Sequence, residues 1–130
     1  MTRYFAMAGS VFYILWGLLH FTAAHAIYNL GVDQGPGMAQ GRLWQDAFFL
    51  FLISCATIYV AIKYNWRNSR LGYWLNFFIV GIEDILFIIL IVMPGYVPVQ
   101  TLLTGPLLWI LGLACTSIAY SKSKPILPNR

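Results

Sequence analysis

Two adjacent carboxylic acids, Glu83 and Asp84, lie in the middle of a long apolar stretch. A charged side chain at the centre of a membrane helix costs roughly 2.5 to 3.5 kcal/mol on insertion scales, so such residues usually have a function. Two carboxyl groups that are close together in an apolar site do not both ionise easily, and at least one is expected to keep its proton and act as an acid. The alternative is that both are neutral and hydrogen-bond neighbouring helices.

Helical spacing brings further polar side chains toward this pair. Asn76 precedes Glu83 by two helical turns and so lies on nearly the same face of its segment. His20 shares a face with Tyr13 in a segment that runs in the same direction, so its imidazole is expected at a similar depth. An imidazole beside a carboxylate is a general acid/base pair or a proton relay. The alternative for His20 is a hydrogen-bonded core histidine.

The predicted roles follow from these chemistries. The predicted catalytic residues are Glu83, Asp84 and His20. The predicted substrate-binding residues are Asn76, Tyr13, Arg42 and Asp46. Arg42 and Asp46 stand four residues apart at the start of the second apolar stretch, where they could line an entrance; the alternative is a structural i,i+4 pair favoured by the helix dipole.

Metal and cofactor sites are poorly supported by the sequence. His25 follows His20 at about 140° around a helix, so the two imidazoles cannot bind one metal ion from the same face. The two cysteines, Cys55 and Cys115, have no CxxC spacing and lie in apolar segments, as small core residues do. No metal is expected. The cofactor stays unknown, with haem an open possibility because one axial histidine suffices to hold it.

The elements that must position these residues are membrane helices. The chain has 130 residues, of which 60% are hydrophobic and 9% charged, and its mean hydropathy is +0.73. Four stretches reach the roughly 20 apolar residues that a membrane span needs. They cover about residues 5–30, 43–64, 72–93 and 102–120, with the longest loop at 31–37. We predict an all-α fold: one transmembrane domain, residues 1–130, forming a four-helix bundle.

The basic residues predict the orientation. All but Arg42 lie on one side of the predicted spans: Arg3, Lys63, Arg67, Arg70, Lys122, Lys124 and Arg130. The positive-inside rule then places both termini in the cytoplasm, in a membrane of the bacterial inner (plasma) membrane type. The basic residues form no stripe with interleaved aromatic residues, so nucleic acid is not an expected partner.

The start of the second apolar stretch resembles a known family. In the small four-helix membrane isomerases, of the styrene oxide isomerase and hydroxylaminobenzene mutase type, the first loop leads into helix two through Ala-His and then an Asn six residues on. The matching positions here are Ala39–Gln40 and Asp46. The resemblance implies rearrangement of a small lipophilic substrate in a trimeric bundle. It departs from the family at Gln40, which replaces the histidine that holds haem in the isomerase.

Three functional hypotheses follow. The first is a membrane-embedded enzyme or cofactor-binding protein that acts on a lipophilic small molecule by acid/base chemistry. The second is an accessory or structural membrane subunit whose polar residues only hold helices together. The third is a small proton-coupled transporter. Small residues at Gly9–Gly17 and Ser54–Thr57 allow close helix approach, so a homo-oligomer is also expected.

Overall fold

The computed structural model describes residues 2–123, and every regular element in that range is helical. The four long helices are α1 (Thr2–Gln34), α2 (Met38–Lys63), α3 (Arg70–Phe87) and α4 (Gly105–Ser121). Three short helical segments connect them: η1 (Asn65–Arg67), η2 (Ile88–Val92) and η3 (Val99–Leu103). The prediction of an all-helical, four-helix chain is confirmed, and all four helices are long and apolar enough to cross a membrane.

The first two helices are longer than predicted. α1 continues to Gln34 and α2 already begins at Met38, so only Gly35–Gly37 connect them. The predicted long loop at 31–37 was wrong because Gly31 is helical and makes room for α2: a Cβ atom added to it would lie 2.8 Å from Trp44 Cδ1. The longest break in the described chain is instead residues 93–98, which contain Pro94 and Pro98.

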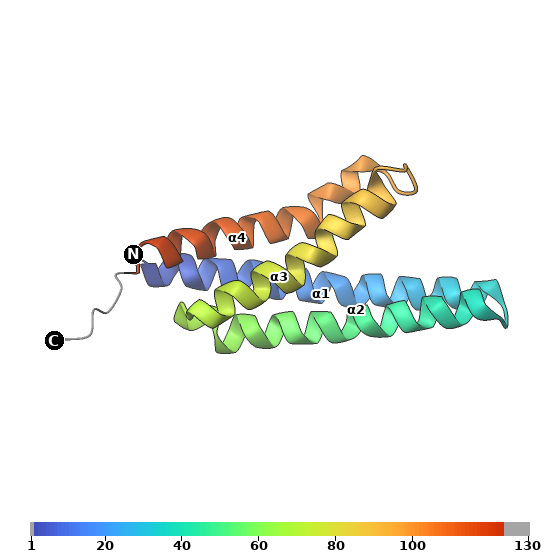
Figure 1. The fold of residues 1–130 in the computed structure, drawn as a ribbon, viewed down its shortest axis with the longest axis horizontal. Coiled ribbons are helices and arrows are strands. Elements are labelled where there is room, and N and C mark those ends of the chain that lie inside the picture. Colours follow the sequence, from blue (N-terminus) through green and yellow to red (C-terminus); the bar gives the residue numbers. More distant parts are fainter. Residues whose placement is uncertain (1, 124–130) are drawn as a thin grey trace.

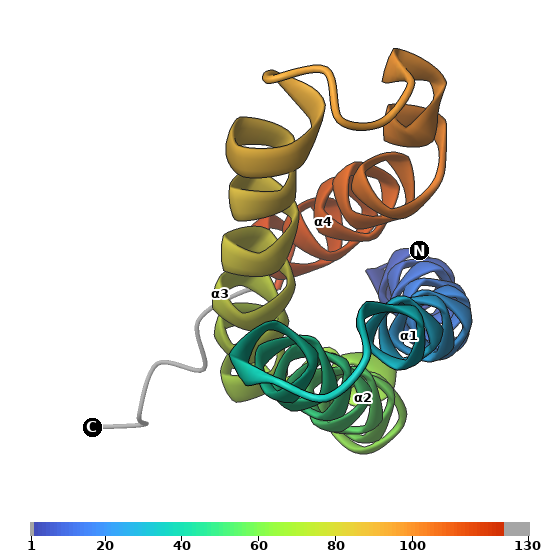
Figure 2. The same ribbon diagram turned by 90° about the vertical axis from the view of Figure 1, so that its right-hand side faces the viewer.

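The helices alternate in direction, so α1 runs parallel to α3 and α2 to α4 (Figure 1). Figure 1 also shows that the far halves of α1 and α2 continue as a pair, whereas α3 and the start of α4 diverge from them. The view along the bundle in Figure 2 shows the same separation of α3 from α1. The polar residues of α3 therefore meet α1 only near the middle of the molecule.

Small residues allow α1 to pack closely against two neighbours. A Cβ atom added to Gly9 would lie 2.6 Å from Thr116 Cγ2 of α4, and one added to Gly17 would lie 2.6 Å from Ile58 Cγ1 of α2. Ser54 and Thr57 of α2 are also fully buried within the chain. The small residues from which an oligomer was expected are thus used inside the bundle, and the homo-oligomer stays a prediction.

The core is narrow and the outer surface is apolar. Tyr13, Trp16, Ala61 and Val80 form a fully buried cluster. Large hydrophobic side chains cover the outside, among them Leu18 at 50% exposure, Phe48 at 60% and Ile82 at 57%. So many exposed large hydrophobic side chains are unusual for a monomer in water and typical of a protein that meets lipid or a partner.

Candidate acid/base site

His20 is held in one orientation by its own helix. Its Nδ1 atom lies 2.8 Å from the backbone oxygen of Trp16, one turn earlier in α1. Because a carbonyl oxygen only accepts hydrogen bonds, Nδ1 must be the donor, which leaves Nε2 as the atom that can take up a second proton. The imidazole also stacks on the Trp16 indole, with ring centroids 3.7 Å apart and planes at 23°.

Asp84 is held by the same tryptophan. The Trp16 indole N–H donates a hydrogen bond of 2.9 Å to Asp84 Oδ2 across the interface of α1 and α3. Asp84 is only 1% exposed and Trp16 is fully buried. Trp16 therefore fixes both titratable groups at once, through stacking on His20 and through a hydrogen bond to Asp84.

The free atoms of the two groups face one position at the start of α4. A Cβ atom added to Gly105 would lie 3.3 Å from His20 Nε2 and 3.2 Å from Asp84 Oδ1. This position borders a cavity of about 90 Å³ lined by Leu19, His20, Asp84, Phe87, Thr104, Gly105 and Pro106. A water molecule takes about 30 Å³ in the liquid, so the cavity has room for a few waters or for the polar end of a small molecule.

The Trp16 hydrogen bond predicts a difference between two tryptophan substitutions. Trp16→Phe removes the donor to buried Asp84, whereas Trp109→Phe removes an indole N–H that has no partner among residues 2–123. Both changes remove the same atoms, but only Trp16→Phe also breaks a hydrogen bond and alters the ring that stacks on His20. We expect Trp16→Phe to be the less stable variant by about 1–3 kcal/mol, from unfolding in mixed detergent micelles. Equal stabilities would show that the bond contributes nothing.

Glu83 does not share this cavity. Adjacent helical residues point about 100° apart, and the Glu83 side chain lies toward α2, partly exposed in a groove of about 280 Å³ lined by Ile53, Phe78, Ile79 and Ile82. The two carboxyl groups therefore face different neighbours of α3: Asp84 faces Trp16 of α1 and Gly105 of α4, and Glu83 faces α2. The structure does not form the single polar stripe that the sequence suggested.

Asn76 and Tyr13 lie away from the cavity as well. Asn76 is eight residues before Asp84 in the same helix, a rise of about 12 Å. Tyr13 packs against Gly112, where an added Cβ atom would lie 3.2 Å from Tyr13 Cε1. Both side chains are fully buried, and neither the Asn76 amide nor the Tyr13 hydroxyl has a hydrogen-bond partner within the described part of the chain. They cannot orient a group bound between His20 and Asp84.

The predicted entrance residues lie on the far half of α2. Arg42, Asp46 and Gln45 line a pocket of about 340 Å³ together with Phe49. The Arg42 guanidinium donates a 3.0 Å hydrogen bond to Gln45, and not to Asp46 as in the alternative of a structural i,i+4 pair. Gln40, which replaces the isomerase histidine, donates a 3.1 Å hydrogen bond to the Gly31 carbonyl and so fastens α2 to the end of α1.

The cavity at His20 does not fit a haem group. The cavity at His20 Nε2 holds about 90 Å³, which is far too small for a porphyrin. His25 is exposed and its Nε2 already accepts a hydrogen bond of 3.1 Å from the Asn29 amide. Within residues 2–123, no three His, Cys, Asp or Glu side chains gather as a metal ion would require.

Two residues that position the site, Trp16 and Gly105, were missed by sequence reasoning. No role was predicted for Trp16, although its spacing of one turn from His20 places the two residues on one face of α1. The sequence indicates only that Gly105 belongs to a Gly-Pro pair at the start of its helix. Its role in the site depends on which side chains of α1 and α3 pack against it, and the sequence does not show this. Comparison of the chain with protein-family models, with curated proteins and with solved structures finds no match.

Proposed function

We propose that the chain is an integral membrane protein in which His20 and Asp84 exchange a proton with the polar end of a small lipophilic molecule. The observation that carries the proposal is the convergence of His20 Nε2 and Asp84 Oδ1 on one position beside Gly105. A base and an acid that share one small cavity are the minimum for acid/base chemistry. Because the cavity is small, only the polar end of a ligand enters it, and the apolar remainder lies outside.

The proposed topology has four spans and both termini in the cytoplasm. The apolar outer surface supports membrane insertion. The start of α1, the turn between α2 and α3 and the end of α4 lie at one end of the bundle, which gathers there the described basic residues other than Arg42, namely Arg3, Lys63, Arg67, Arg70 and Lys122. By the positive-inside rule this end is cytoplasmic. Lys124 and Arg130 lie outside the described residues.

The proposed homo-oligomer is supported by Glu83. A carboxyl group in the middle of a membrane helix is costly when it faces lipid, and Glu83 lies partly exposed at the α2–α3 groove. A second copy covering that groove would remove the carboxyl group from lipid. This role for Glu83 is structural and separate from the His20–Asp84 pair.

The experiment uses Trp16 as the reporter of the site. Cyclohexanone, cyclohexene oxide and cyclohexanol present a ketone, an epoxide and an alcohol on one apolar skeleton. Each is titrated into the protein in nanodiscs, and the Trp16 signal is the difference in emission between the wild type and Trp16→Phe. We expect at least one compound to change this signal saturably, because the indole contacts both His20 and Asp84.

The variants separate an acid/base site from helix adhesion. Asp84→Asn keeps an oxygen for the Trp16 N–H but loses the acid, and we expect it to weaken the response about tenfold or more, as the loss of one charge-assisted hydrogen bond does. The matched control is Glu83→Gln, which changes the neighbouring carboxyl group and is expected to respond as the wild type does. If Asp84→Asn responded to the compounds as the wild type does, the accessory-subunit hypothesis would be favoured. If the wild type responded to no compound, the proposal would be contradicted.

A further inference from the structure

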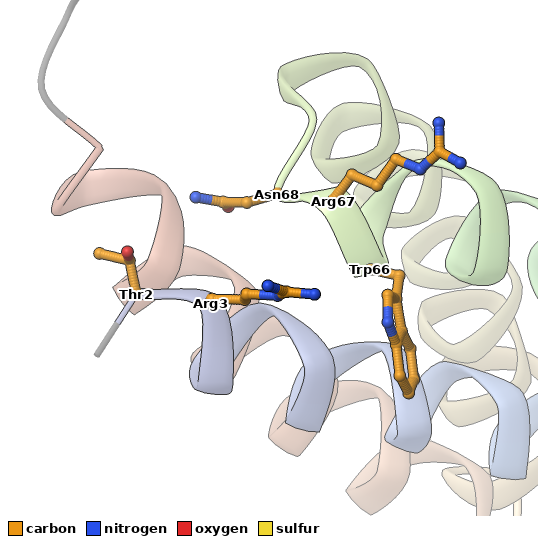
Figure 3. Close-up of a pocket in the computed structure, with 5 residues that line it drawn as sticks. All are labelled: Thr2, Arg3, Trp66, Arg67 and Asn68. Carbon is orange, nitrogen blue, oxygen red and sulfur yellow. The ribbon is translucent and has the colours of Figure 1, made fainter.

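The basic end of the bundle contains a pocket that is separate from the His20–Asp84 cavity. It has a volume of about 420 Å³ and is lined by Thr2, Arg3, Trp66, Arg67 and Asn68. Figure 3 shows that the Arg3 side chain extends from α1 toward Trp66, while Arg67 stands on the opposite wall with its guanidinium directed outward. Both arginines are exposed and therefore free to turn toward a ligand.

The walls of this pocket are fixed by contacts between three segments. Asn68 has the left-handed conformation, with φ 55°, and ends η1. Its amide donates hydrogen bonds of 3.2 Å to the Ala119 carbonyl and 2.6 Å to the Ser123 hydroxyl, which joins the α2–α3 turn to the end of α4. Lys122 Nζ, which follows α4, lies over the ring of Phe5 on α1, 5.7 Å from the ring centroid.

The positive charge at this end is not balanced by acidic side chains. The described basic residues here are Arg3, Lys63, Arg67, Arg70 and Lys122, whereas all four acidic residues of the protein, Asp33, Asp46, Glu83 and Asp84, lie in the far half or the middle of the bundle. The first turn of α1 adds unpaired backbone N–H groups and the positive end of a helix dipole beside Arg3. An anion is the ligand that this combination attracts.

The type of anion follows from the donors. Arginine guanidinium groups match the planar, two-oxygen face of a phosphate, and Thr2 and the Trp66 indole supply neutral donors beside them. Trp66 is partly buried, and tryptophan is enriched at the level of lipid headgroups. We propose that the pocket between Arg3 and Arg67 binds the phosphate group of an anionic ligand, as carried by an anionic lipid headgroup or by free phosphate.

The test measures thermal unfolding in neutral detergent with three additions. These are short-chain phosphatidylglycerol, short-chain phosphatidylcholine and inorganic phosphate. Because a ligand that binds only the folded state raises Tm, we expect phosphatidylglycerol or inorganic phosphate to raise it by several degrees and phosphatidylcholine to have a smaller effect. A rise with phosphatidylglycerol alone identifies a lipid headgroup as the source, and an equal rise with inorganic phosphate identifies free phosphate.

Two double variants with the same loss of charge locate the site. Arg3→Gln with Arg67→Gln removes the pocket arginines, and Arg42→Gln with Arg70→Gln removes two arginines that do not line it. We expect the first to weaken the apparent affinity about tenfold or more and the second to leave it within about twofold. If the first double variant folds poorly, the apparent affinities of the single variants Arg67→Gln and Arg70→Gln are compared instead. Equal losses, or no Tm rise in the wild type, would overturn the proposal.

Discussion

Replacing Gly105 with alanine is expected to abolish the ligand response of Trp16 and to lower the free energy of unfolding by about 1–3 kcal/mol. The added Cβ atom would lie 2.8 Å from His20 Cε1, closer than carbon atoms can approach without a shift. His20 cannot move away cheaply, because its ring is stacked on Trp16 and its Nδ1 donates to the Trp16 carbonyl. The methyl group would also occupy the position on which His20 Nε2 and Asp84 Oδ1 converge.

Gly41→Ala is the matched control for this prediction. It makes the same change inside α2, where no other described atom lies within 4 Å of the added Cβ atom. Alanine is a better helix former than glycine, so Gly41→Ala is expected to be neutral or to stabilise by roughly 0.5–1 kcal/mol. Both variants are measured by the Trp16 emission assay and by unfolding in mixed micelles. A Gly105→Ala protein that keeps the wild-type response would show that the cavity is not where the ligand binds.

The second large effect is expected at Gly72, near the start of α3. A Cβ atom added there would lie 2.6 Å from Tyr64 Cβ and 2.8 Å from the backbone nitrogen of Asn65. Backbone atoms cannot give way as a side-chain tip can, so the α2–α3 turn must shift. We expect Gly72→Ala to destabilise by about 3 kcal/mol, the upper end of the usual cost of overpacking.

Gly81→Ala provides the comparison within the same helix. The three atoms nearest to its added Cβ atom would all belong to the Trp109 ring, the closest at 3.0 Å, and a ring edge can move by a few tenths of an ångström. The loss of stability should therefore be clearly smaller than at Gly72, while the gain in helix propensity is the same. If unfolding in mixed micelles gave the reverse order, the close packing of η1 against α3 would not limit stability.

Much of the fold followed from the sequence because lipid-length apolar stretches and prolines leave few alternatives. The helices at residues 72–93 and 102–120 were predicted within a few residues, since Pro94 and Pro98 mark the break between them. The end of α1 and the start of α2 were not predicted correctly, because a glycine such as Gly31 can either end a helix or let two helices approach each other. Only the position of Trp44 on the partner helix decides between the two.

The site could be predicted only in part for a related reason. Because α1 and α3 run in the same direction, the sequence was sufficient to predict that His20 and Asp84 lie at a similar depth. Which of two adjacent acids turns toward α1 depends on the rotation of α3 about its axis, and the hydrophobic pattern around Glu83 and Asp84 does not fix that rotation. The hydrogen bond from Trp16 selects Asp84 and leaves Glu83 on the α2 side.

The pairing of Trp16 with Asp84 also has a consequence for biogenesis. In the membrane topology proposed above, helices enter the bilayer in chain order, so α1 and α2 can close as a hairpin around Gly17 and Gly31 before α3 has been synthesised. When the acidic helix follows, the indole donor for Asp84 is already present in the membrane. In that topology the first hairpin acts as an internal insertion partner for α3, because its Trp16 N–H lowers the cost of bringing the Asp84 carboxyl group into lipid.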